Sequence, residues 1–77
     1  MDWSKCAAVD RDPERMGGVW CFRGIRLAVV SLFEYLDKGS TVEEFLEQFP
    51  AVSAEEVHEV LAFVMRSLEQ KQPAAVA

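Results

Sequence analysis

The sequence predicts a small, mainly α-helical domain: a three-helix, helix-turn-helix bundle preceded by a short N-terminal β-hairpin arm. Three observations support this prediction. Two helix-starting motifs, "TVEE" at 41–44 and "SAEE" at 53–56, follow each other closely. Apolar residues recur at helical spacing from residue 29 onward. Two short runs rich in β-forming residues come just before them.

The 77 residues leave room for one structural domain. Within it we expect an arm with the hairpin over 1–29, a trihelical part over 30–70 and a disordered tail over 71–77. Hydrophobic residues make up 51% of the chain, which is more than so small a protein buries alone. We therefore expect a second copy or another protein to cover part of the apolar surface.

The hairpin is predicted within "GGVWCFRGIRLAV" at 17–29, after an extended piece, "VDRDPE", that ends in a turn. Its strands would be 19–22 and 25–29, joined by a two-residue turn at Arg23-Gly24. Strand alternation would place Trp20 and Phe22 on one face of this ribbon. Turn positions with positive φ are expected at the four glycines, Gly17, Gly18, Gly24 and Gly39.

The three helices have clear boundaries. The first carries an apolar stripe from Val29 to Leu36 and ends at Gly39. The second begins after Thr41, spans 42–48 and closes before Pro50. The third begins after Ser53 and spans 54–70. Its core stripe would hold Val57, Val60, Leu61, Val64 and Leu68, while Phe63 and Met65 lie off that stripe.

No catalytic, cofactor or metal site is predicted. The glycines of 17–24 match no phosphate-loop pattern, and bulky apolar residues follow them as in a strand. Glu55 and His58 have the spacing of a bundle metal motif, but such sites need a second motif, so we expect an exposed His58. Cys6 and Cys21 are expected as thiols in a reducing compartment. We expect no enzyme and no small-molecule substrate.

Charge is distributed unevenly. Residues 1–26 carry a net charge of +1 and residues 27–77 a net charge of −6. Acidic residues at the start of the third helix argue against its entry into a DNA groove. DNA contact would instead come from the arm, unless its arginines pair with Asp10, Asp12 and Glu14. The candidate arginines are Arg11, Arg15, Arg23 and Arg26.

Aromatic side chains beside arginines are common anchors of protein interfaces. The ribbon also has a free strand edge, which favours pairing with a second copy. We therefore expect a homodimer or partner interface, with no membrane contact, since no apolar run approaches the length of a membrane span. The expected location is the cytoplasm, because the first residues do not form a signal peptide. The candidate interface residues are Trp20, Phe22, Ile25, Phe63 and Met65.

A longer pattern runs from Val9 to Phe63: Asp-Pro, Gly-Gly, a Gly-x-Arg step, a helix ending in glycine, "TVEEF", Phe-Pro and "SAEE". It resembles the small bacterial family known as domain of unknown function 433. The matching turn and arm residues are Gly17, Gly18, Gly24 and Arg26. Trp20, Ile25 and Ala28 stand where this family commonly has proline, threonine and proline, which makes the ribbon more apolar.

The resemblance implies a homeodomain-like trihelical fold and dimers. It also implies an antitoxin that binds a PIN-like ribonuclease toxin and optionally its own operator DNA. Two alternatives stay open: a stand-alone helix-turn-helix regulator, and an interaction adaptor without a nucleic-acid role.

Overall fold

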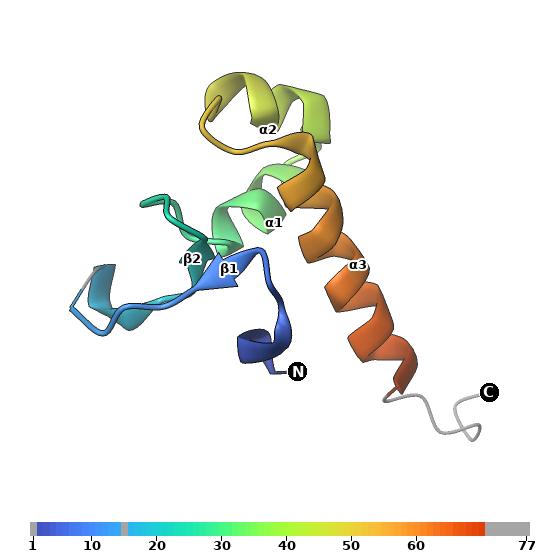
Figure 1. The fold of residues 1–77 in the computed structure, drawn as a ribbon. Coiled ribbons are helices and arrows are strands. Elements are labelled where there is room, and N and C mark those ends of the chain that lie inside the picture. Colours follow the sequence, from blue (N-terminus) through green and yellow to red (C-terminus); the bar gives the residue numbers. More distant parts are fainter. Residues whose placement is uncertain (1, 15, 71–77) are drawn as a thin grey trace.

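A computed structural model describes residues 2–14 and 16–70 of the chain. Arg15 and the predicted tail over 71–77 lie outside the described residues. Three α-helices follow a small antiparallel strand pair, so the predicted mainly α-helical fold with a preceding hairpin is confirmed (Figure 1). The helices are α1 (Val30–Asp37), α2 (Val42–Gln48) and α3 (Ala54–Gln70). The strands are β1 (Val9–Asp10) and β2 (Cys21–Phe22). A 3₁₀ turn forms η1 (Trp3–Lys5), and η2 (Met16–Gly18) is a short turn in which Gly17 has non-helical angles, with φ 71°.

Both predicted helix starts are reciprocal capping boxes. The Thr41 hydroxyl accepts from the Glu44 amide at 3.1 Å, and the Glu44 carboxylate accepts from the Thr41 amide at 2.8 Å. Ser53 and Glu56 repeat this exchange at 3.1 and 2.9 Å. These bonds satisfy backbone donors that a helix start leaves unpaired, so α2 and α3 begin where the sequence places them.

The strand pairing differs from the predicted hairpin. Val9 pairs with Phe22 and Asp10 with Cys21, so β2 pairs with the segment expected only as an extended piece. The predicted second strand over 25–29 contributes a single bridge, Ala28 opposite Cys21. Its extension is blocked because Val29 already has helical backbone angles, φ −58° and ψ −33°, and leads directly into α1.

The turn between the predicted strands is nevertheless present. The Ile25 amide donates to the Phe22 carbonyl oxygen at 2.9 Å, which closes a β-turn over Arg23 and Gly24. Gly24 has a φ of 75°, and the other three glycines also have positive φ, as predicted. The chain then separates from β2 for two residues and returns at Leu27, whose carbonyl oxygen accepts from the Phe22 amide at 3.0 Å.

Every main element contributes to one hydrophobic core. Phe22 of β2, Leu32 of α1, Phe45 of α2, and Val57 and Val60 of α3 are all 0% exposed. Around Phe45 the rings of Phe22, Tyr35 and Phe49 pack with centroid distances of 5.0–6.1 Å. Both cysteines are buried. This core fixes β2 against the helices and so positions the surface next to β2.

Candidate functional site

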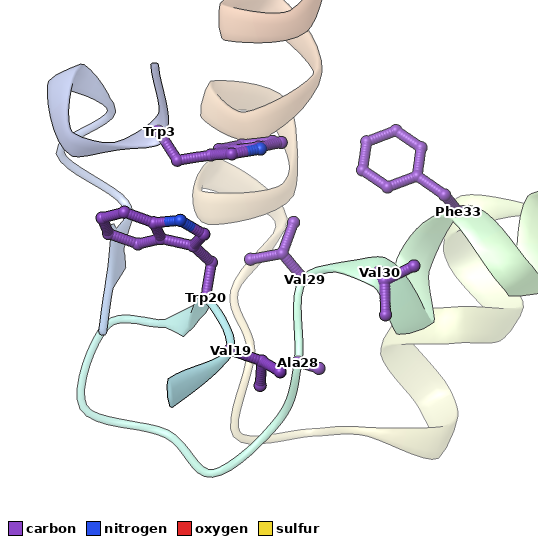
Figure 2. Close-up of a pocket in the computed structure, with 7 residues that line it drawn as sticks. All are labelled: Trp3, Val19, Trp20, Ala28, Val29, Val30 and Phe33. Atoms are coloured by element: carbon purple, nitrogen blue, oxygen red, sulfur yellow. The ribbon is translucent and has the colours of Figure 1, made fainter. Parts of the chain in front are cut away.

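A hollow of about 380 Å³ opens on the surface between the strand segment and the start of α1 (Figure 2). We call it the aromatic groove. Three segments contribute to it: η1, the chain around β2, and the first turns of α1. All of its lining residues are apolar, namely Trp3, Val19, Trp20, Ala28, Val29, Val30 and Phe33.

Trp20 is held in place from two sides. Its carbonyl oxygen accepts a hydrogen bond from the Val29 amide at 3.0 Å, which ties it to the start of α1. The guanidinium carbon of Arg11 lies 5.3 Å from the centroid of the Trp20 ring, within the range of a cation–π interaction. The indole is half-buried and has a positive charge beside it.

Trp3 reaches the groove because η1 folds back onto α3. The side chain of Asp2 caps this turn, accepting from the amide and the hydroxyl of Ser4 at 3.0 and 2.6 Å. These two hydrogen bonds, the hydroxyl one first, lower the pKa of the Asp2 carboxyl below its ordinary value. The Trp3 ring then packs on Phe63 with a centroid distance of 5.0 Å.

The groove is suited to apolar contact. Val19 and Val30 are 43% and 56% exposed, high values for large apolar side chains in so small a protein. Its lining holds no group that ionises, so it offers burial rather than acid–base chemistry.

The predicted interface residues do not gather in one place. Trp20 lines the groove, Ile25 is half-buried near the β-turn, and Met65 is exposed on α3. Phe22 and Phe63 are buried, at 0% and 8% exposed, so the prediction that they contact a partner is wrong. Phe22 belongs to the core beneath the sheet, and the Trp3 ring covers Phe63.

The third helix differs from its predicted stripe in a second way. Leu68, expected in the core, is 56% exposed, because the last turns of α3 extend past the other helices (Figure 1). Leu61, Met65 and Leu68 share one side of the helix at spacings of four and three residues. We call these three residues the α3 ridge. Met65 and Leu68 are exposed there, and Leu61 is half-buried.

The candidate arginines have separate roles. Arg11 stacks on Trp20. Arg23 donates from Nε to the Ala7 carbonyl oxygen and from Nη2 to the Val9 carbonyl oxygen, both at 2.8 Å. Arg26 is exposed, and Arg15 lies outside the described residues. Arg23 is therefore a structural clamp on β1, which the sequence did not indicate.

Acidic side chains of the arm are used in turns. Asp10 accepts from the Gly24 amide at 3.3 Å, and Asp12 accepts from the Glu14 amide at 2.9 Å. The first bond ties the β-turn to β1, and the second holds local backbone in place. Asp10 and Asp12, which were predicted as possible partners of the arm arginines, thus also bind backbone amides.

Groove residues that the sequence did not single out are Trp3, Val19, Val30 and Phe33. Val30 carries the clearest signal in retrospect, because it lies on the side of α1 away from the buried Leu32, whereas Phe33 belongs to the apolar stripe predicted for the core. Trp3 carries none, since an isolated aromatic near the start of the chain does not reveal that it packs on Phe63.

His58 and Glu55 are both exposed on α3. Within residues 2–14 and 16–70 there is no group of three or more His, Cys, Asp or Glu side chains that could hold a metal ion. No helix in this part of the chain is long and apolar enough to cross a membrane.

Comparison with known proteins places the chain by its sequence pattern. No curated protein and no solved structure matches it. The pattern of one family, a protein family of unknown function called DUF433, matches residues 9–64. The match starts at β1 and ends near the middle of α3, so it includes the strand pair, the β-turn and most of the helical core. The chain therefore belongs to the DUF433 family.

Proposed function

We propose that this chain is a non-enzymatic, antitoxin-like protein that binds a PIN-like ribonuclease toxin in the cytoplasm and keeps it inactive. The observation that carries the proposal is the α3 ridge, where Met65 and Leu68 are 58% and 56% exposed. The identity of the partner is the expectation that the DUF433 resemblance carries. The ridge supports the part of the proposal that concerns protein binding.

The α3 ridge has the form of a helix-in-groove contact. Residues at spacings of four and three along one side of a helix are the usual anchors when a helix enters an apolar groove of a partner. Methionine suits such a surface, because its unbranched, polarisable side chain adapts to the shape it meets. Leu61 continues this apolar side toward the core, so an entering partner would cover a continuous strip.

DNA contact is a second, optional part of the proposal. The start of α3 presents Glu55 and Glu59 to solvent, and these carboxylates would repel phosphates. Arg11 and Arg26 are exposed on the arm, where a dimer would double them. Operator binding therefore fits the arm and not the third helix. A stand-alone regulator and a plain adaptor are the competing functions.

The test is co-expression with a PIN-like ribonuclease, which the proposal expects a neighbouring gene to encode. The wild-type chain is expected to relieve growth arrest, and Met65→Glu and Leu68→Glu to lose relief, with affinity falling on the order of a hundredfold. Glu59→Gln, on the polar side of α3, is the matched control and is expected to keep relief. Absence of relief by the wild type, or full relief by both ridge variants, would contradict the proposal.

Salt-dependent binding to the upstream DNA separates the competing functions. If the arm contacts an operator, the binding constant falls steeply as salt rises, and Arg26→Ala reduces that slope. A stand-alone regulator would bind DNA without relieving any nuclease. An adaptor would bind neither the nuclease nor the operator.

A further inference from the structure

The aromatic groove leaves apolar surface open on both of its sides. Trp20 forms one side, and Val30 and Phe33 at the start of α1 form the other, with Val29 between them (Figure 2). Val30 is 56% exposed, and Trp20 and Phe33 are half-buried, so an occupant would cover surface that now meets solvent. The charged groups beside the groove then determine which occupant fits.

The α1 side of the groove is acidic. Glu34 follows Val30 by four residues, which places both on one side of the helix. Asp37 follows Phe33 by the same spacing. Both carboxylates are exposed, and α1 itself contains no lysine or arginine, although Lys38 follows as its C-cap residue. An occupant that covers the apolar side chains of α1 therefore comes next to two acids.

The strand side is also acidic in balance. The Arg11 guanidinium carbon lies 5.3 Å from the centroid of the Trp20 ring, so the segment around Arg11 runs beside the groove. Residues 10–14 hold this one base and three acids, Asp10, Asp12 and Glu14, which gives a net charge of −2. Asp12 and Glu14 are exposed. Both sides of the groove therefore favour a cationic occupant.

The contact between Arg11 and Trp20 indicates which cation suits this groove. A guanidinium is planar and weakly hydrated, so it stacks on aromatic rings more readily than an ammonium does. Phe33 and Trp3 offer further aromatic surface in the same groove. The stem of an arginine side chain is apolar and can be buried on such a surface while its charged end stays at the edge.

We propose that the aromatic groove docks a segment of another protein that presents arginine side chains next to apolar ones. Its apolar side chains cover Val19 and Val30, and its guanidinium groups reach the carboxylates of Glu34 and Asp37. Nucleic acid does not fit, because its phosphates would meet the same acids. A second copy brings the same acidic groups and a net charge of −5, so like charges would face each other.

This inference goes beyond the proposed toxin binding and uses a different surface. The α3 ridge lies on the third helix, whereas the aromatic groove lies between the strand segment and α1. Variants of Met65 change the first surface and variants of Val30 change the second. Loss of binding at one surface is therefore recognised separately from loss at the other.

The test is binding of two labelled synthetic peptides to the full chain, followed by fluorescence anisotropy. Both peptides carry leucine along one helix face, and the remaining positions are arginine in the first and glutamate in the second. The arginine peptide is expected to bind at least about tenfold more tightly than the glutamate peptide.

Paired removal of acids tests the charged part of the contact. Glu34→Gln combined with Asp37→Asn is expected to weaken binding of the arginine peptide on the order of tenfold. Glu55→Gln combined with Glu59→Gln removes the same charge from the exposed start of α3 and is the matched control. It is expected to change the affinity by less than about threefold, which is the effect of net charge alone.

Substitution of Val30 tests the apolar part. Val30→Lys is expected to weaken binding of the arginine peptide on the order of tenfold or more, because it removes apolar contact and adds a like charge. Met65→Lys adds the same charge to the α3 ridge and is expected to stay within about threefold of the wild type. Circular dichroism checks that both variants keep their helices.

Three results would overturn the proposal. The first is equal binding of the two peptides by the wild type, and the second is an equal effect of the variants in either matched pair. The third is self-association of the wild type that Val30→Lys abolishes, since sedimentation equilibrium would then assign the groove to a second copy.

Discussion

The Nη2 atom of Arg23 donates a 2.8 Å hydrogen bond to the carbonyl oxygen of Val9, so a residue of the β-turn holds β1 in place. The Nε atom of the same side chain donates to the Ala7 carbonyl oxygen at 2.8 Å, and the Arg23 amide donates to the Ala8 carbonyl oxygen at 2.8 Å. Three consecutive carbonyl groups are thus bound by one residue. A sheet with two-residue strands has few backbone hydrogen bonds between its strands, so the Arg23 bonds are important for holding β1 against β2.

Arg23→Ala is expected to lower the free energy of unfolding by about 1–2 kcal/mol, because two charge-assisted hydrogen bonds are lost at an exposed site. Urea unfolding followed by tryptophan fluorescence measures this. Arg26→Ala, an exposed arginine of the same arm, is the matched control and changes stability by less than about 0.5 kcal/mol. Equal losses in both variants would show that Arg23 is not a structural clamp.

Phe63→Ala is expected to lower the free energy of unfolding by about 3 kcal/mol, since it removes a buried ring and the contact with Trp3. Met65→Ala, two residues along the same helix but 58% exposed, is expected to lower it by less than about 0.5 kcal/mol. The comparison uses thermal unfolding followed by circular dichroism. The opposite order would mean that Phe63 faces solvent, as its place off the sequence stripe suggested.

Gly24→Val is expected to lower the free energy of unfolding by about 1–3 kcal/mol, because a β-branched residue at a φ of 75° is strained. Space is not the cause, since a Cβ at this position would meet nothing within 4 Å. Gly24→Asn is expected to lose less, because asparagine tolerates the left-handed region. Chemical denaturation checks both variants, and equal stability of Val and Asn variants would rule out the backbone explanation.

The Asp2 carboxyl gives a prediction on pH. Its pKa is lowered in the folded chain, first by the Ser4 hydroxyl and then by the Ser4 amide, so its stabilising effect is present above the ordinary pKa and is lost as pH falls through the lowered one. Ser4→Ala is expected to raise the pKa of Asp2 toward its ordinary value. NMR titration of the Asp2 carboxyl carbon measures the shift, and an Asp2 pKa that is the same in both proteins would contradict the role of the Ser4 hydroxyl.

Local signals in the sequence account for the helical part of the fold. The two capping boxes and the glycine after α1 depend on residues three or four positions apart. Such short-range motifs can be recognised in the sequence without the structure. The β-turn at Arg23-Gly24 can be recognised in the sequence for the same reason. These elements were predicted at their observed positions.

Contacts between residues far apart in the chain could not be predicted from the sequence in this way. Nothing local indicates that β2 pairs with Val9–Asp10 as well as with the short stretch at 27–29, whose pairing ends where α1 begins at Val30. The same holds for Phe63, whose burial depends on Trp3, which lies 60 residues earlier in the chain. The aromatic groove joins three such segments, so only Trp20 of its lining was predicted at an interface.

Native mass spectrometry of the chain co-expressed with a candidate PIN-like ribonuclease tests the proposed toxin binding most directly, since it counts both kinds of subunit at once. The wild-type chain is expected to form a complex that contains both proteins. Leu68→Glu is expected to give the chain without nuclease. A wild-type chain that carries no nuclease, or a Leu68→Glu chain that carries as much as the wild type, would contradict the proposed function.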